Sequence, residues 1–313
     1  MNPIVSTMDV RAALKEAMAR LRQGQVPSHT LAAELLLMHV TGRDRAWLYA
    51  HPEETLDAAS LERYFALVAE RIAGTPTQYL TGKQEFWGLE LHVEPGVLIP
   101  RPETEHIVEV ALERIGRPRG EEAALRGTRL RIVDVGTGSG CLAVALAHEL
   151  PAAEVFATDI SAKALEIARG NAARHDAHVH FVQCSLLEPF FSRGPFEFSA
   201  GGADAVETKR SFDLIVSNPP YVPRDEIEQL PRDVIGHEPD VAIFGGADGS
   251  QFYGPLVAQA ARVLRPGGHL VMELGYNTLE RVRPLFDAWS AWKHIRVTQD
   301  LAGIARVIAA ERT

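Results

Sequence analysis

The chain has 313 residues, of which 46% are hydrophobic and 23% charged, a mix typical of a globular protein with one large or two ordinary domains. No apolar stretch approaches the roughly 20 residues of a membrane-spanning helix, and the N-terminal residues lack the pattern of an export signal. Two cysteines and a net charge of −9 disfavour a disulfide framework and a protein that grips many phosphates, so we expect a cytoplasmic protein with no membrane partner and no direct nucleic-acid partner.

Residues 1–83 carry their apolar side chains at helical spacing. The three stretches with this spacing are 8–23, 31–38 and 61–72. Ser28 and Thr30 precede the second stretch, and either can cap a helix there. Gly74 and Pro76 follow the third stretch and predict its end. We therefore predict a small N-terminal helical domain over 1–83, whose apolar stripes form the core.

Residues 84–100 change to short apolar alternations around Glu94–Pro95–Gly96, a sequence typical of a turn. This pattern predicts a β-hairpin linker over 84–100. The two prolines at 100 and 102 then favour an extended approach, and Glu103 or Thr104 can open a helix.

From about Leu130 onward, short apolar strands alternate regularly with helices. The predicted strands are 131–136, 154–160, 178–184, 212–218 and 269–275, with final strands in 295–309, and the predicted helices are 140–150, 161–175, 254–268 and 278–289. This alternation indicates an α/β, Rossmann-like domain over 101–313 with a mostly parallel, doubly wound sheet. Residues 191–211 lack periodicity and predict an inserted surface loop.

A glycine-rich turn joins the first predicted strand of this domain to the helix that follows. It reads Asp134, Val135, Gly136, Thr137, Gly138, Ser139 and Gly140 in order. Glycines allow a ligand to approach the backbone closely, and the helix N-terminus offers unpaired N–H groups. By itself the turn could serve NAD, FAD or S-adenosylmethionine.

Two acids favour one of these ligands. Asp134 lies just before the first glycine, where its charge repels a pyrophosphate but suits the ammonium group of a methionine moiety. Asp159 ends the second strand of the domain, where a carboxylate accepts hydrogen bonds from ribose hydroxyls. This pattern favours a methyltransferase over a dehydrogenase.

A second motif follows the predicted strand 212–218. It consists of Asn218, Pro219, Pro220 and Tyr221. A substrate amide can donate one hydrogen to the Asn218 side chain and one to a turn carbonyl such as that of Pro219, which aims its nitrogen at an electrophile. Tyr221 can pack its ring over the flat group. A plain proline turn that closes a strand is the structural alternative.

The combination of the glycine turn and Asn-Pro-Pro-Tyr resembles class I methyltransferases that modify NH₂ groups. Further segments narrow the resemblance to bacterial peptide chain release factor glutamine methyltransferases. These segments are Tyr79–Gly82, Glu85–Gly88, Leu98–Glu105, His237–Pro239, Gly245–Gly249 and Asp300–Arg306. The similarity covers nearly the whole chain, including the helical N-terminal part.

The resemblance implies methylation of glutamine N5 in the Gly-Gly-Gln loop of class-one release factors. It implies that S-adenosylmethionine, with S-adenosylhomocysteine as product, is held by Gly136–Gly140, Asp159 and Asn218. It further implies that Asn218–Tyr221 hold the substrate glutamine and that the helical domain and the hairpin help to bind the release factor. Arg101, Thr104 and Glu105 would line or brace the donor site. Family members commonly carry an acid near the adenine where this chain has Ser185, whereas Leu186 can still pack on the ring.

Three other functions are weighed against this one. A ribosomal protein could be the glutamine substrate, although the 98–105 segment favours the release factor branch. A DNA or RNA amino-methyltransferase is disfavoured by the net negative charge of the chain. A non-catalytic binding protein is disfavoured because both the donor motif and the acceptor motif are intact. We expect no metal, because the spacing of His175, His178 and His180 fits no standard zinc pattern.

Overall fold

The computed structural model describes residues 7–116, 129–191 and 211–313, and the chain divides into two compact units. The first unit takes the chain up to Lys83 together with Pro231–His237, and the second takes Gln84–Leu230 and Glu238–Thr313. The insertion expected at 191–211 falls, apart from its two end residues, outside the described residues. Within those residues, no helix is both long and apolar enough to cross a membrane.

The first unit is helical, as predicted. Its elements are β1 (Met8–Asp9), α1 (Val10–Gln23), α2 (His29–Thr41), α3 (Arg45–Ala50), β2 (Thr55–Leu56), α4 (Ala58–Ala73) and α5 (Thr77–Thr81). Aspartates cap three of these helices, as Asp57 does by accepting a hydrogen bond from the Ser60 backbone N–H at 2.8 Å. Ser28 lies at the N-cap position of α2, as predicted, but its backbone is left-handed (φ 49°) and its side chain makes no capping bond.

Apolar faces of α1, α2 and α4 form the core of this unit. Tyr64 on α4 is fully buried there, and its hydroxyl donates to the Ala33 carbonyl of α2 at 3.0 Å. A buried phenol needs such a partner, so the bond fixes α4 against α2 as well as satisfying the hydroxyl.

The hairpin is shorter than the sequence suggests. Its strands are β3 (Lys83–Phe86) and β4 (Leu89–His92), joined by Trp87 and Gly88, which have φ of 56° and 72°. Two consecutive residues with positive φ give a turn whose twist matches that of the paired strands. A turn lies at Pro95–Gly96, as predicted, but it joins no strands, so its place in the hairpin was predicted wrongly. Residues 93–101 continue without strand structure into η1 (Pro102–Thr104) and α6 (Glu105–Ile115).

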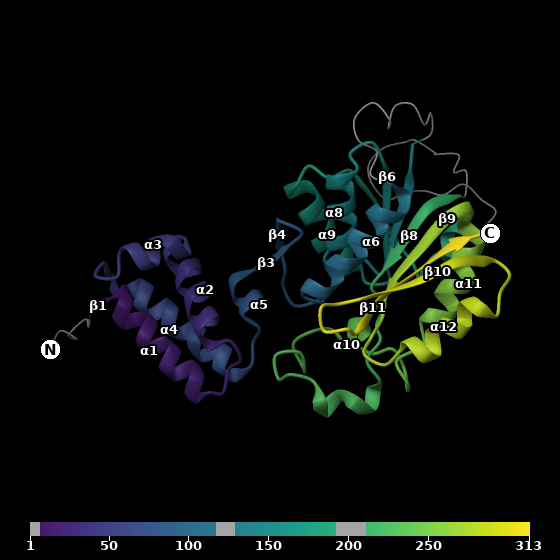
Figure 1. Ribbon diagram of the computed structural model, residues 1–313. Coiled ribbons are helices and arrows are strands. Elements are labelled where there is room, and N and C mark those ends of the chain that lie inside the picture. Colours follow the sequence, from purple (N-terminus) through teal and green to yellow (C-terminus); the bar gives the residue numbers. More distant parts are fainter. Residues whose placement is uncertain (1–6, 117–128, 192–210) are drawn as a thin grey trace. The chain divides into compact units, whose positions relative to one another are not determined.

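In the described part of the second unit, seven strands form one sheet in the order β10-β11-β9-β8-β5-β6-β7 (Figure 1). The strands are β5 (Arg131–Val135), β6 (Glu154–Asp159), β7 (Val179–Gln183), β8 (Phe212–Ser217), β9 (Leu264–Glu273), β10 (Trp292–Gln299) and β11 (Ala305–Arg312). All neighbours from β9 to β7 pair in parallel, and β10 and β11 pair antiparallel. This confirms the prediction of a Rossmann-like, mostly parallel sheet.

Helices cover both faces of the sheet. They are α6, α8 (Cys141–Glu149), α9 (Ala162–Arg174), α11 (Tyr253–Val263) and α12 (Leu279–Asp287), with short α10 (Asp240–Ile243), η2 (Glu188–Phe191) and η3 (Arg224–Gln229) in the loops. The prediction that α11 runs to Gly268 is wrong. The helix ends at Val263 because Leu264 already pairs with Phe212 of β8, so the glycines that follow belong to β9.

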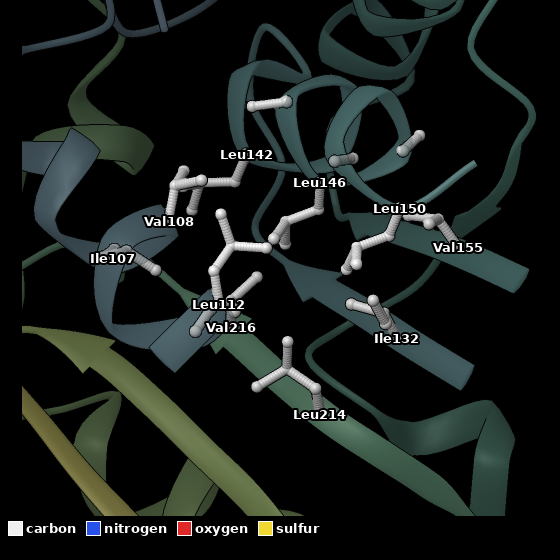
Figure 2. Close-up of a cluster of buried hydrophobic side chains, with 14 of the residues drawn as sticks. Ile107, Val108, Leu112, Ile132, Leu142, Leu146, Leu150, Val155, Leu214 and Val216 are labelled. Carbon is white, nitrogen blue, oxygen red and sulfur yellow. The ribbon is translucent and has the colours of Figure 1, made fainter. Parts of the chain in front are cut away.

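Figure 2 shows the core on one face, where Leu112 of α6 and Leu146 of α8 meet Val216 of β8 and Ile132 of β5. On the other face, Leu256 of α11 lies in a second core cluster with sheet residues. Because both faces are buried, these strands read as continuous apolar runs. The same coverage leaves the strand ends as the accessible part of the sheet.

Candidate functional site

The carboxyl ends of β5, β6, β7 and β8 lie at one edge of the sheet and frame a pocket within the second unit. Strand β5 lies between β6, which follows it in the chain, and β8, which comes later, so the strand order reverses direction at β5. Open α/β sheets bind their ligands at such a switch point. The pocket is lined by these candidate donor and acceptor residues: Gly136, Thr137, Gly138, Ser139, Asp159, Leu186, Asn218 and Pro220. Arg101, Thr104 and Ser185 line it as well.

The glycine turn opens its backbone toward the pocket. Gly136 and Gly138 have φ of 73° and 55°, and a Cβ built on either would meet no atom within 4 Å. Side chains here would therefore occupy the space of a ligand. Gly140 has another role, since its Cβ would come within 3.0 Å of the Ala168 Cβ, so this glycine permits close packing of α8 against α9.

Asp159 connects β6 to the glycine turn. Its Oδ2 accepts a hydrogen bond from the Gly138 N–H at 2.9 Å, and its Oδ1 accepts one from the Ser161 N–H at 2.8 Å. Burial raises the pKa of Asp159, and the backbone hydrogen bonds oppose that rise. Each carboxylate oxygen has a second lone pair, so the residue can still accept hydrogen bonds from hydroxyls in the pocket.

Asp134 lies behind the turn and does not line the pocket. Its side chain is almost fully buried, and its Oδ2 accepts from the Thr137 hydroxyl at 2.6 Å and the Ala143 N–H at 3.2 Å. Within the described residues its Oδ1 is buried without a hydrogen-bond partner. Burial raises the pKa of Asp134 to about 7. The structure thus places this acid where it supports the turn, one layer away from the cavity.

The Asn-Pro-Pro-Tyr corner follows β8. Asn218 and Pro220 line the pocket, whereas Pro219 is buried and Tyr221 lies behind the wall. The ring of Tyr221 packs against Gly275, where an added Cβ would come within 2.6 Å of it. A ring in that place supports the corner from behind instead of covering a group inside the pocket.

Several pocket residues carried no signal in the sequence. Ile160 and Val241 are large apolar residues that remain 59% and 52% exposed, and both line the cavity. Exposed apolar side chains at a pocket rim are typical of contacts that a ligand covers. The hydrophobic residue directly after Asp159 is the one such feature that could be recognised from the sequence.

Another part of the pocket wall is held by an ion pair between a half-buried arginine and a buried glutamate. Arg101 lines the pocket, and its Nη2 contacts the Oε1 of Glu238, which is itself buried. The other oxygen of Glu238 accepts from the Ile99 N–H at 3.3 Å. Glu238 therefore joins the segment before α6 to the segment before α10, and both segments contribute pocket residues.

These features fit S-adenosylmethionine. An open glycine backbone suits the close approach of an amino-acid moiety, Asp159 can accept from ribose hydroxyls, and Ile160 with Leu186 offers apolar surface for a purine. No charged phosphate-binding side chain is needed for such a ligand.

Two family models match the chain. A model described as the PrmC N-terminal domain matches residues 12–82, and one described as a methyltransferase domain matches residues 127–303. Among solved structures, the hMettl16 catalytic domain in complex with a MAT2A hairpin aligns with a TM-score of 0.52 and 15% identity, covering 78% of this chain and 81% of that one. At this identity the likeness concerns the fold alone.

Two curated relatives align along almost the entire chain. The release factor glutamine methyltransferase of Koribacter versatilis is 41% identical, with 97% of this chain and 99% of the relative covered. That of Moorella thermoacetica is 40% identical over the same shares. The methyltransferase domain together with the pocket identifies this protein as an enzyme that uses S-adenosylmethionine. With relatives of one description matching from end to end, the chain belongs to the release factor glutamine methyltransferase family.

Proposed function

We propose that this protein transfers a methyl group from S-adenosylmethionine to the side-chain N5 of the glutamine in the Gly-Gly-Gln motif of class-one peptide chain release factors. The observation that carries the proposal is that Asn218 and residues 136–139 of the glycine turn contribute to the wall of one pocket. The description of the relatives supports the release factor as substrate. Since release factors act during translation, the enzyme works in the cytoplasm.

In this proposal the donor is bound by Gly136–Gly140, Asp159 and Leu186. Backbone N–H groups at the start of α8 face an anionic carboxylate favourably, and Asp159 accepts from the ribose. Asp134 acts through the turn, since its carboxylate holds the Thr137 hydroxyl and adds negative charge beneath the ammonium group. The bound donor supplies an electrophilic methyl group on a positively charged sulfur.

The acceptor is a planar amide, whose nitrogen is a poor nucleophile because its lone pair is delocalised. Asn218 Oδ1 accepts one N–H of this amide, and the carbonyl of Pro219 accepts the other. Holding both hydrogens directs the nitrogen toward the methyl group, and it withdraws positive charge from the nitrogen as the new bond forms. Pro220 and Tyr221 stiffen the corner so that these two acceptors keep their places.

The reaction is a direct in-line displacement. Attack by the glutamine nitrogen forms the N–C bond while the C–S bond breaks, and the electron pair of that bond stays on sulfur. The extra proton on nitrogen then leaves to solvent. No covalent intermediate with the enzyme is formed, and the contribution of Asn218 and Pro219 is orientation and charge stabilisation.

The two ends of the chain divide the work in this proposal. The helical domain over 1–83 and the hairpin linker over 84–100 help to bind the release factor, and 101–313 carries out the transfer. The match of residues 12–82 to the PrmC N-terminal domain supports a role that is specific to this family.

Labelled donor tests the function directly. The protein is incubated with labelled S-adenosylmethionine and a release factor, a ribosomal protein or DNA. Label in a single glutamine-containing peptide of the release factor is the expected result. Label in DNA, or in neither protein, would contradict the proposal.

A pair of variants tests the division between acceptor and donor sites. We expect Asn218→Ala to lose methyl transfer while donor binding is retained, because Asn218 acts mainly on the amide. Asp159→Ala should lose donor binding itself. If Asn218→Ala weakened donor binding as severely as Asp159→Ala does, the acceptor role of Asn218 would be wrong.

A further inference from the structure

The Asn-Pro-Pro-Tyr corner at 218–221 is called the acceptor corner below. A buried carboxylate at the end of β9 connects Tyr221 of this corner, through Thr104, to Asn218. Glu273 is 1% exposed, and its Oε1 accepts a hydrogen bond from the Tyr221 hydroxyl at 3.1 Å. Its Oε2 accepts one from the Thr104 hydroxyl at 2.7 Å. The Thr104 oxygen in turn accepts from Asn218 Nδ2 at 3.1 Å. Residues of η1, of the corner after β8 and of β9 thus meet in one continuous network of hydrogen bonds.

The direction of these bonds follows from chemistry. A hydroxyl has a single hydrogen, and an ionised carboxylate can only accept. Thr104 therefore gives its hydrogen to Glu273 and can only accept from Asn218. Because the carboxamide donates solely through nitrogen, Nδ2 of Asn218 must face Thr104. The hydrogen-bond partners thus distinguish the nitrogen from the oxygen of the amide, which the similar shapes of the two atoms alone do not.

We propose that Thr104 and Glu273 are positioning residues for the transfer, which lock the Asn218 carboxamide with Nδ2 inward so that Oδ1 stays available to the substrate amide. The proposal rests on the proposed function, because it assigns the free oxygen to a substrate N–H. Thr104 also lines the pocket, so its hydroxyl lies at the correct place to act on Asn218 from the side.

The lock matters because a carboxamide has two orientations of nearly equal shape. Rotation by half a turn would present Nδ2 to the substrate amide, so two donors would face each other and the acceptor would be lost. In the first orientation Nδ2 donates to the Thr104 oxygen, whereas in the other Oδ1 would face that oxygen as a second acceptor, so the first orientation is strongly favoured. Thr104 thereby converts an ambiguous side chain into a fixed acceptor.

The surroundings of Glu273 favour its ionised form and so keep these hydrogen bonds in the direction described. Burial raises the pKa of Glu273, whereas the hydrogen bonds from Thr104 and Tyr221 lower it. The guanidinium of Arg306 also favours the ionised carboxylate, and the charge of Glu103 opposes it. Arg306 is itself fixed by Asp300, whose Oδ2 lies 2.8 Å from its Nε. Two hydroxyl donors and a nearby cation thus compensate a carboxylate that has no solvent contact.

Variants of Thr104 test the lock through a split between kcat and donor affinity. Thr104→Val removes the hydroxyl but keeps the shape, and we expect it to lower kcat with release factor by roughly tenfold or more while donor affinity changes less than about twofold. Thr104→Ser restores the hydroxyl and should restore kcat, a rescue that a packing role would not give. The matched control is Thr313→Val, which removes a hydroxyl bonded to Ser290 O at 2.9 Å outside the pocket and should leave kcat unchanged.

If the wild-type protein methylates the release factor and Thr104→Val keeps its kcat, the inference is wrong while the proposed function stands. A second measurement needs no methyl acceptor. The side-chain amide signals of Asn218 are identified in ¹⁵N-labelled protein by their absence in Asn218→Ala. We expect them to move and to exchange faster with water in Thr104→Val, and to keep their wild-type position in Thr104→Ser.

The two measurements separate the possible failures. Amide signals that respond to Thr104→Val, in a protein that does not methylate release factor, would uphold the lock and refute its proposed substrate. Amide signals that stay unchanged in Thr104→Val would overturn the inference whatever the enzyme methylates.

Discussion

Asp159 combines two tasks in one side chain. It faces the pocket, and it also holds the glycine turn and the start of α9 through the N–H groups of Gly138 and Ser161. A residue with both tasks couples the shape of the turn to the presence of the ligand. This coupling explains why a neutral replacement of equal size should be damaging here.

Asp159→Asn should weaken donor binding. Replacing one oxygen by NH₂ sets a donor against a backbone N–H and removes an acceptor for the ribose, at a cost of about 1.5–3 kcal/mol. Calorimetric titration with S-adenosylmethionine measures the loss, which corresponds to roughly a tenfold to hundredfold higher Kd. Asp57→Asn is the matched control, because asparagine caps α4 as well as aspartate does. An unchanged Kd in Asp159→Asn would remove this residue from the donor site.

Because Asp134 is buried, the stability of the protein should depend on pH. Its pKa is raised from 3.8 to about 7, mainly by burial, so the folded protein holds the proton more tightly than the unfolded chain does. Compared with a variant that carries a neutral side chain here, the wild-type protein should lose stability as the pH rises from about 4 to about 7. At about 1.4 kcal/mol for each unit of pKa shift, the loss is up to about 4 kcal/mol. The loss should be complete slightly above pH 7.

Denaturant unfolding of wild type and Asp134→Asn between pH 4 and pH 8 checks this, with the pH limits chosen to bracket the shift. The variant cannot titrate at this position, so the difference between the two curves isolates Asp134 from all other groups. As the pH rises, the free energy of unfolding of the variant should increase relative to that of the wild-type protein. A difference that stays constant across the range would mean that Asp134 is already ionised throughout.

At the scale of elements, the loop Gly245–Gly249 holds the acceptor corner from outside. The Gly245 N–H donates to Val222 O at 2.9 Å, and the Val222 N–H donates to Ile243 O at 3.0 Å. A Cβ on Gly249 would come within 2.2 Å of the Tyr221 carbonyl oxygen. The loop therefore approaches the corner so closely that only glycine fits, and it fixes the backbone that carries Asn218.

Gly249→Ala should displace this corner. The added methyl group meets backbone atoms that cannot rotate away, so we expect a loss of about 1–3 kcal/mol in stability and a marked fall in kcat. Gly303→Ala is the control, since Gly303 has nearly the same φ, 78° against 76°, but open space around its Cβ. Both variants share the backbone strain, so only the clash distinguishes them. Equal kcat values for the two would rule out the loop as a support of the corner.

The elements themselves were largely predictable from sequence, and the reasons are local. Strands buried on both faces and amphipathic helices leave periodic patterns, so the sheet and its helices over 131–289 could be recognised. The hairpin turn at Trp87–Gly88 was missed because a tryptophan with positive φ has no sequence signal. The glycine turn and Asn218 were found because their residue types are chemically specific. Glu273 was not resolved as a partner of Thr104, since 169 residues separate them in the chain.

On the scale of the whole molecule, the division into units does not follow the chain order. Residues Pro231–His237 leave the second unit in sequence and pack with the first. There, Arg71 of α4 is 7% exposed, and its Nη2 lies 2.8 Å from Asp233 Oδ2. An apolar pattern does not reveal such a segment when a contact that joins it to the first unit is a charge pair formed across 162 residues.

Asp233→Asn should therefore destabilise the first unit selectively. Removing the countercharge leaves the Arg71 guanidinium buried and uncompensated, which costs about 2–4 kcal/mol. Asp287→Asn breaks an exposed pair with Arg283 at 3.2 Å in the second unit and should cost less than about 1 kcal/mol.

Thermal unfolding with and without S-adenosylmethionine separates the units, because the donor stabilises only the unit that binds it. We expect Asp233→Asn to lower the transition that the donor does not shift, since Arg71 and Asp233 both lie in the first unit. If the variant lowered the donor-dependent transition by the same amount, the two units would unfold as one cooperative body, and the charge pair would support the catalytic unit as well.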